Sequence, residues 1–370
     1  MRIMSVQRLW IFLAGCLLLV TFCEVLIYWV VLLTCTWPQL NIAREKSETL
    51  RAMLLADTHL LGSRNGHWLD KLRREWQMQR AFQTAMTIHS PDIVFVLGDL
   101  LDEGKWADDK EFQDTVDRFH RMFSTPSHTD LQVVVGNHDI GFHYMASEHK
   151  LHRFNRALNA ESVKLLRVKG NAFVLINSVA MEGDRCSLCR EAEEQLREVA
   201  QSLQCSAGYD TTACSEADRN AILNRPIVLQ HYPMYRQTDE KCEGADAARG
   251  RERTQWFKER WDCISKESSK KILKLLNPRL IFSAHTHNGC YLEHPPDSIP
   301  EWTIASFSWR NRNNPVFLLA VIHQDGFAVE KCFLPNESTV VTIYVIGGTV
   351  LLIYLTFPRK FLFRNQRKKL

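Results

Sequence analysis

The chain lacks a strong excess of charge of either sign. Its 370 residues contain 46 Lys and Arg and 42 Asp and Glu, which gives a formal net charge of +4. Much of this excess lies in the last few residues, so the rest of the chain offers no basic surface typical of nucleic-acid binding, and we exclude nucleic acid as a partner. Internal repeats and low-complexity tracts are also lacking. The length and the 45% hydrophobic content fit one large globular domain or two small ones.

Long hydrophobic runs are present, one near each end of the chain. Residues 10–37 are apolar throughout except for Glu24 and exceed the ~20 residues that span a bilayer. No small-residue cleavage site precedes Pro38, and the run is longer than the core of a signal peptide, so we predict a retained membrane anchor. Residues 339–357 are predicted to form a second transmembrane helix.

Basic residues flank both runs on their outer sides. Because basic flanks stay in the cytoplasm, residues 1–9 and the basic tail 358–370 are predicted to be cytoplasmic. Residues 38–338 would then form a domain on the far side of the membrane, which we expect to be luminal. The protein is thus predicted to be a multi-pass membrane protein.

The cysteines agree with an oxidising compartment. Of 11 cysteines, Cys16, Cys23 and Cys35 fall in the predicted first span. The remaining number is even, which favours disulfides, above all within the cluster of cysteines that runs from Cys186 to Cys214, whose pairing the sequence does not give. A zinc site at Cys186-x-x-Cys189 is disfavoured, because no second close pair completes it.

Between the predicted spans, short apolar runs alternate with helical patterns, which is typical of an α/β domain. The predicted strands are Met53–Ala56, Ile93–Leu97, Gln132–Val135, Ala172–Asn177, Pro226–Gln230 and Leu280–Ser283. The predicted helices are Trp68–His89, Asp108–Phe123, Arg190–Leu203 and Ser265–Leu276. Antiparallel strands are predicted at Trp302–Ala305, Val316–His323 and Phe327–Leu334.

Metal-type ligands follow five of the predicted strands, where open α/β sheets build their sites. These residues are Asp57, His59, Asp99, Asn137, His138, His231, His285 and His287. Taken singly, each motif also fits a helix cap or a buried hydrogen-bonded ring. Together, carboxylate, imidazole and amide oxygen suit two divalent ions such as Mn²⁺, Fe²⁺ or Zn²⁺. The recurrence therefore predicts a centre with two metal ions.

The ordered motifs Asp-x-His, Gly-Asp-x-x-Asp, Gly-Asn-His-Asp, His and Ala-His-x-His resemble those of the calcineurin-like metallophosphoesterases, and the match runs from Asp57 to His287. The resemblance implies a four-layer α/β/β/α sandwich, here with a transmembrane helix at each end, and metal-dependent hydrolysis of phosphoric esters. Ala284 stands where the family usually has glycine. Its methyl group is expected to crowd the backbone at His285.

The resemblance also implies a role for each site residue. One ion would be held by Asp57, His59 and His287, and the other by Asn137, His231 and His285. Asp99 would bridge the two ions, between which a water would become the nucleophile.

Two further residues are candidates for a catalytic role. His138 would be the general acid, and Asp139 would orient its ring. In an alternative, His138 only positions the phosphate. Asp102 is expected to support a ligand or to cap a helix. His143 and Arg310 are further candidate contacts to phosphate or glycan.

Outside the metal motifs, the stretches GHWLDKLRREWQMQRAFQTA, LLDEGKW, GNHDIGFHY, QHYPMYR and SFSWRNRNNP are similar to the family members that remodel GPI anchors in the early secretory pathway. This similarity implies manganese dependence and removal of the side-branch ethanolamine phosphate from the second mannose of GPI anchors, supporting their transport from endoplasmic reticulum to Golgi. GPI-anchored proteins would be the substrates, and ER–Golgi cargo receptors would be partners. The expected location is ER exit sites, the intermediate compartment and the Golgi, which the terminal lysines Lys368 and Lys369 also favour.

Two other functions stay open at this point. A luminal phosphatase of other phosphate esters is one, because a metal site alone does not choose between mono- and diesters. A non-catalytic protein that binds GPI-anchored cargo is the other, although the complete ligand set argues against it.

Overall fold

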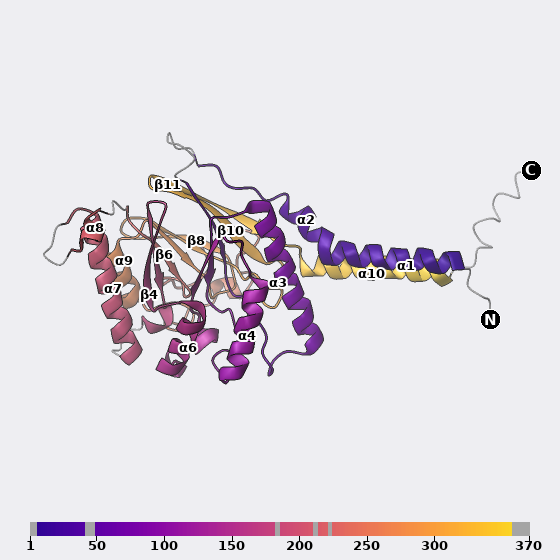
Figure 1. The fold of residues 1–370 in the computed structure, drawn as a ribbon, viewed down its shortest axis with the longest axis horizontal. Coiled ribbons are helices and arrows are strands. Elements are labelled where there is room, and N and C mark those ends of the chain that lie inside the picture. The colour runs from indigo at the N-terminus through magenta and orange to yellow at the C-terminus, as the bar shows by residue number, and fades with distance from the viewer. Residues whose placement is uncertain (1–5, 41–48, 182–185, 210–213, 221–223, 357–370) are drawn as a thin grey trace, which may run out of the picture.

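Two β-sheets packed face to face form the centre of the structure, a computed structural model that describes residues 6–40, 49–181, 186–209, 214–220 and 224–356 (Figure 1). The first sheet has the order β11 (Gly326–Phe333), β10 (Val316–His323), β1 (Leu50–Leu55), β2 (Ile93–Leu97) and β3 (Asp130–Val134). The second has the order β4 (Val163–Val168), β5 (Asn171–Ile176), β6 (Ile227–Gln230), β7 (Leu280–Ser283), β9 (Ile299–Thr303) and β8 (Cys290–His294).

The central strands of each sheet run parallel. In the first sheet β1 pairs with β2 and β2 with β3, and Leu54 lies opposite Phe95. In the second sheet β5, β6, β7 and β9 are parallel, and Leu229 lies opposite Phe282. Because parallel strands end at the same edge, the residues after β1, β2 and β3 are neighbours, as are those after β6 and β7.

Alternate residues of the central strands enter two different cores, since side chains alternate between the faces of a strand. Leu54 and Phe95 face the second sheet, and the Phe95 ring centroid lies 5.1 Å from that of Phe173. Their neighbours Met53 and Val94 pack with helices on the outer faces. These helices are α3 (Trp68–His89), α4 (Asp109–Met122), α7 (Ser187–Ser206) and α9 (Lys266–Leu276). The layers are therefore α/β/β/α, and the predicted fold class is confirmed.

Shorter helical elements connect the layers. They are α5 (Asn137–Ile140), α6 (Glu148–Leu158), α8 (Glu216–Asn220) and the single turns His143–Met145, Ser178–Ala180 and Glu252–Thr254. The predicted strand at Trp302–Ala305 is shifted to Ile299–Thr303, and it runs parallel to β7 and antiparallel to β8. Sequence patterns did not predict β4, β8 or α6.

Two apolar helices extend side by side from the sandwich (Figure 1). The first, Val6–Leu32, comprises α1 (Val6–Thr21), a wider turn at Phe22–Leu26 and α2 (Ile27–Leu32), and the second is α10 (Glu337–Thr356). Both are long and apolar enough to cross a membrane. A Cβ atom on Gly347 would lie 2.7 Å from Leu19, so glycine permits the close approach of the two helices.

Glu24, the one charged residue in the first apolar run, has protein partners. Its carboxylate accepts a hydrogen bond from the Tyr344 hydroxyl of α10 at 2.6 Å. Its carbonyl accepts one from Trp76 Nε1 of α3 at 3.2 Å. Glu24 therefore links both apolar helices to the sandwich.

The first apolar helix ends earlier than predicted. It stops at Leu32, and Trp37 Nε1 donates a hydrogen bond to the carbonyl of His89 at 3.1 Å. Cys35 forms a disulfide with Cys332 of β11, so its assignment to the span is wrong. This segment is apolar because it packs on the sandwich. The predicted basic tail, 358–370, lies outside the described residues.

Two more disulfides join described residues. Cys205 pairs with Cys214, which confirms the prediction of a disulfide in that cluster. Cys242 pairs with Cys290, which sequence spacing did not indicate.

Candidate active site

Seven polar side chains converge at the carboxyl ends of the parallel strands. They are Asp57 and His59 after β1, Asp99 after β2, Asn137 after β3, His231 after β6, and His285 and His287 after β7. All but the two histidines after β7 are buried. The structure thus brings together all seven residues predicted to bind metal.

The first group of these side chains surrounds His59. Its Nε2 lies 3.1 Å from Nε2 of His287, 3.6 Å from Oδ2 of Asp99 and 3.9 Å from Oδ1 of Asp57. His287 Nε2 is in turn 3.7 Å from Asp57. Ring nitrogens and carboxylate oxygens that face one point in this way can hold a divalent ion.

The second group surrounds His231. Its Nε2 lies 3.3 Å from Oδ2 of Asp99, 3.1 Å from Oδ1 of Asn137 and 3.2 Å from Nδ1 of His285. The same Asp99 oxygen therefore faces both groups. This is the position that a bridging carboxylate requires.

Hydrogen bonds fix which nitrogen of each imidazole faces the cluster. His231 donates from Nδ1 to the carbonyl of Leu97 at 2.7 Å, and His285 donates from Nε2 to the carbonyl of Trp261 at 2.7 Å. The opposite nitrogens face each other, and that of His231 also faces Asn137; each would offer a lone pair to a bound ion. Such outer partners orient metal-binding histidines in proteins generally.

The electrostatics of the cluster fit bound cations. Both carboxylate oxygens of Asp57 are buried without a hydrogen-bond partner. Burial and the nearby Asp99 raise the pKa of Asp57 to about 8. Burial lowers the pKa of His285 to about 3, so its ring is neutral, as a metal ligand must be. Two divalent ions would supply the positive charge and the bonding partners that these buried groups lack.

The backbone is strained at five of the seven residues. Positive φ angles occur at Asp57 (54°), His59 (46°), Asp99 (51°), His285 (74°) and His287 (58°). Each costs of order 1–3 kcal/mol for a residue other than glycine, and such strain gathers at functional sites. The strain turns successive side chains after a strand toward one point, which explains how Asp-x-His and His-x-His serve one cluster.

Close packing of the backbone requires glycine at two positions. A Cβ atom on Gly98 would lie 2.6 Å from Nδ1 of His231, and one on Gly136 would collide with Asp99. Ala284, by contrast, has no positive φ, and its N–H donates to the carbonyl of His231 at 2.8 Å. The expected crowding by its methyl group does not displace His285 from the cluster.

His138 lies beside both groups and is held by Asp102. Its Nδ1 is 2.9 Å from the Asp102 carbonyl and 3.4 Å from Oδ1 of Asp102. Burial acts to lower the pKa of His138, but Asp99 and Asp102 raise it above its ordinary value. The backbone N–H of His138 also donates to Oδ1 of Asp99 at 2.7 Å, so this residue helps to orient the Asp99 carboxylate.

The prediction that Asp139 orients the His138 ring is wrong. Its carboxylate accepts hydrogen bonds from the N–H groups of Leu101 at 2.9 Å and Gly136 at 2.8 Å. Asp139 therefore fixes two of the loops that carry metal-type ligands, those after β2 and β3, and it caps the first turn of α5.

Asp102 has the supporting role that the sequence left open. Its Oδ1 also lies 3.2 Å from Nδ1 of His59, and Oδ2 accepts a hydrogen bond from Arg310 at 2.8 Å. Lys105 Nζ stands 3.3 Å from Nδ1 of His138. Lys105 lies in the stretch LLDEGKW, but no role was predicted for it from the sequence, and the fold brings it to the site.

Stacked aromatic rings form one wall beside the cluster. Phe142 and Trp261 stack with centroids 4.1 Å apart, and Tyr144 continues the stack with its centroid 6.3 Å from that of Phe142. A cavity of about 290 Å³ lies against this wall, lined by Trp261 and His285 together with acidic Glu252 and Asp262. Sequence reasoning missed the wall, because Trp261 comes from a different loop than Phe142 and Tyr144.

A buried cluster of carboxylates and imidazoles at the strand ends of an α/β/β/α sandwich defines a metal-dependent phosphoesterase. A family model described as "Calcineurin-like phosphoesterase" matches residues 50–289, a range that contains the whole cluster, and the chain belongs to this family.

Curated relatives match far more than the catalytic cluster. The chain is 48% identical to "Metallophosphoesterase 1" of Mus musculus over 90% of this chain and 85% of that protein. It is 50% identical to the protein of that name from Gallus gallus over the same shares. With the Danio rerio protein it shares 48% identity over 93% and 90% of the two chains.

Proposed function

We propose that this phosphoesterase is a dimetal phosphodiesterase that removes the side-branch ethanolamine phosphate from the second mannose of GPI anchors. The observation that carries the proposal is a cleft of about 630 Å³ where the apolar helices meet the sandwich. Ile27 and Val31 of α2 line it, together with Arg249 and Arg312. Arg312 also donates a hydrogen bond to the carbonyl of His287 at 3.2 Å.

A GPI anchor has the chemistry to use this cleft. Its lipid stays in the membrane while its phosphates and sugars extend into the aqueous phase. A cleft with apolar side chains from a membrane helix and cationic side chains next to a metal-type ligand suits that combination. A soluble phosphate ester would need no cleft that combines apolar side chains of a membrane helix with cationic side chains.

The cavity beside the aromatic wall suits the ethanolamine group. The ammonium of ethanolamine would be attracted by the ring of Trp261 and by the carboxylates of Glu252 and Asp262. His285, which lines the same cavity, would bring the attached phosphate to the metal centre. The cavity thus favours a phosphodiester with a cationic substituent.

The residues divide between two ions as the distances group them. Asp57, His59 and His287 would hold one ion, Asn137, His231 and His285 the other, and Asp99 both. We propose Mn²⁺ for both positions; Fe²⁺ and Zn²⁺ suit the same ligands. When bound, the ions supply charge neutralisation of the phosphoryl oxygens and an activated water.

His138 would protonate the departing sugar oxygen. Its raised pKa keeps a proton available, and Asp102 holds the ring through the carbonyl bond at Nδ1. Lys105 and Arg310 add positive charge on this side, where negative charge develops in the transition state.

The proposed location is the membrane of the early secretory pathway, with the sandwich in the lumen. The disulfides Cys35–Cys332, Cys205–Cys214 and Cys242–Cys290 support an oxidising compartment. Two apolar helices that leave the sandwich side by side support two membrane spans. Protease treatment of sealed membranes tests this orientation: the sandwich should be protected, and its digestion would contradict the proposal. ER–Golgi cargo receptors stay predicted partners.

Mass spectrometry of a GPI-anchored reporter tests the substrate in cells. In cells lacking this protein, the side-branch ethanolamine phosphate should persist. Wild type and the exposed control Asp297→Asn should remove it, whereas Asp99→Asn should not. An unchanged glycan in every line would contradict the GPI substrate and favour another phosphate ester.

A further inference from the structure

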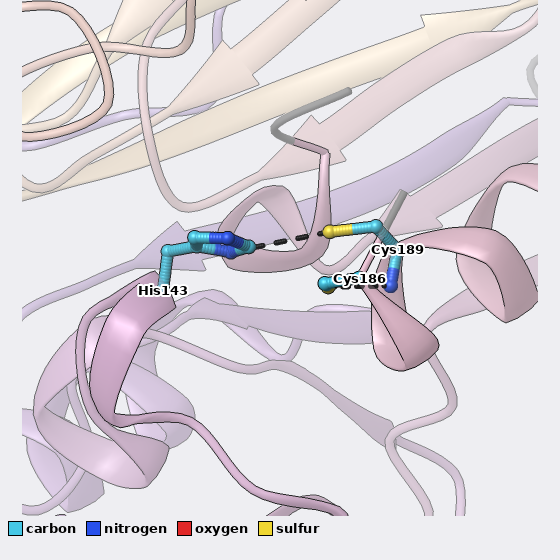
Figure 2. A group of neighbouring side chains, drawn as sticks. All are labelled: His143, Cys186 and Cys189. Atoms are coloured by element: carbon cyan, nitrogen blue, oxygen red, sulfur yellow. Dashed lines mark hydrogen bonds between the residues drawn. The ribbon is translucent and has the colours of Figure 1, made fainter. Parts of the chain in front are cut away.

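A second cluster of metal-type ligands lies outside the phosphoesterase site. His143 comes from the turn His143–Met145, and Cys186 and Cys189 come from the start of α7 (Figure 2). Their candidate ligand atoms all lie within 4.8 Å of one another. The His143 ring is directed at Cys189, with Nδ1 3.9 Å from Sγ. The fold thus adds an imidazole to a Cys-x-x-Cys pair that looked incomplete in the sequence.

These separations are close to those of ligands that share one zinc ion. With bonds of about 2.3 Å to sulfur and about 2.0 Å to nitrogen at a tetrahedral angle, the two ligand atoms stand roughly 3.5 Å apart. A small side-chain movement would bring His143 and Cys189 from 3.9 Å to that value. The Cys-x-x-Cys spacing is itself typical of zinc sites.

The local backbone holds the sulfur of Cys186 at the start of α7. The N–H of Cys189 donates to Sγ of Cys186 at 3.0 Å, which orients this sulfur. Cys186 is the N-cap of the 20-residue helix α7, whose dipole favours negative charge at that end.

We propose that Cys186, Cys189 and His143 bind one Zn²⁺ ion, with water as the fourth ligand. Soft thiolates select zinc, whereas the oxygen- and nitrogen-rich phosphoesterase site also accepts harder ions. The two sites therefore differ in the metal that each prefers. This assignment does not depend on the identity of the substrate.

A zinc ion at this position would anchor one wall of the active site. His143 directly follows Phe142, whose ring stacks on Trp261 at 4.1 Å. The same segment continues from α5, which begins with Asn137 and His138. The ion would tie this loop to α7 and so hold the Phe142 ring in place.

Cobalt substitution tests the site in the full chain, purified in detergent and stripped with a chelator. Thiolate bound to Co²⁺ gives an intense near-ultraviolet charge-transfer band, and the phosphoesterase cluster contains no sulfur. Wild type and the control Cys16→Ser, altered in α1, should show this band with one equivalent of Co²⁺. Cys189→Ser should lose it, and His143→Ala should need at least ten times more free Co²⁺.

Two outcomes would overturn the proposal. One is a wild-type titration without the sulfur band, and the other is peptide mapping that finds a Cys186–Cys189 disulfide in the purified protein. An unchanged far-ultraviolet circular dichroism spectrum of Cys189→Ser would show that its loss of the band is local. If that variant does not fold, X-ray absorption at the zinc edge of the wild-type protein tests the site instead. Two sulfur atoms bound to zinc would support the site, and fewer would contradict it.

Discussion

Replacing Asp102 by asparagine tests how the site is supported without touching a proposed metal ligand. One carboxylate serves three groups: Oδ1 lies 3.2 Å from Nδ1 of His59 and 3.4 Å from Nδ1 of His138, while Oδ2 accepts from Arg310. With Nε2 of His59 facing the cluster, its Nδ1 carries the proton. All three neighbours are therefore donors.

Asparagine has the same shape but only one acceptor oxygen. If its NH₂ faces Arg310, two hydrogen-bond donors face each other there. If its NH₂ faces His59 and His138, it meets the N–H donors of the two rings instead. The first orientation loses the hydrogen bond from the Arg310 guanidinium, at a cost of about 1.5–3 kcal/mol. The second orientation loses the contact of a carboxylate oxygen with the two rings. We expect kcat/KM to fall roughly 10- to 100-fold, the range found when groups behind metal ligands are changed.

Steady-state hydrolysis of a phosphodiester by the full chain over a range of Mn²⁺ concentrations measures this effect. Recovery at high Mn²⁺ would assign the loss to the His59 site, and a persistent fall in kcat would assign it to His138. The control Asp297→Asn should match wild type. A kcat/KM for Asp102→Asn within twofold of wild type would refute the reasoning that the carboxylate holds these groups.

Three further predictions follow from the same structure. Trp261→Ala keeps the backbone carbonyl that accepts from His285 but removes the ring beside the cavity. Initial rates with an ethanolamine phosphodiester should show KM raised about 2- to 30-fold and little change in kcat. An unchanged KM would show that the ring does not bind substrate. Tyr344→Phe deletes the hydroxyl that donates a hydrogen bond to Glu24. Thermal unfolding in detergent should show the free energy of unfolding lowered by about 0.6–1.7 kcal/mol. An equal free energy of unfolding would show that this hydrogen bond between the helices contributes nothing. Removal of metal by a chelator should abolish hydrolysis and lower the unfolding temperature, because ions that bind only the folded chain stabilise it. Mn²⁺ should restore both, and hydrolysis that survives metal removal would contradict the metal site.

Much of the fold could be predicted because local patterns and tertiary structure agree. Continuous apolar runs such as Ile93–Leu97 and Leu280–Ser283 are buried on both faces, and they match β2 and β7 to the residue. The metal-type ligands follow such strands directly, so the strand positions also located the cluster. Strand β4 escaped prediction because its burial is partial along most of its length.

The parts that sequence could not show depend on contacts between distant segments. Asp102 is visible within its motif, but its role rests on His59, His138 and Arg310, which arrive from three other loops. Cys35 looked like part of an apolar span because the segment that packs on the sandwich is as apolar as a membrane helix. Its partner Cys332 shows that the span had already ended.

The aromatic wall and the thiolate–imidazole cluster escaped prediction for the same reason. Phe142 and Trp261 belong to unrelated loops, and each ring alone reads as ordinary packing. The pair Cys186-x-x-Cys189 lacked a partner in sequence until the fold placed His143 beside it. Spacing rules work within one segment, whereas these features join several.

The most direct test of the account is the reaction itself. The purified full chain with Mn²⁺ would be incubated with a GPI glycan that carries the side-branch ethanolamine phosphate. The masses of the products would be measured by mass spectrometry. We predict loss of one ethanolamine phosphate with wild type and none with Asp99→Asn. An intact glycan in the presence of wild-type protein that binds Mn²⁺ and hydrolyses a simple phosphodiester would contradict the proposed substrate.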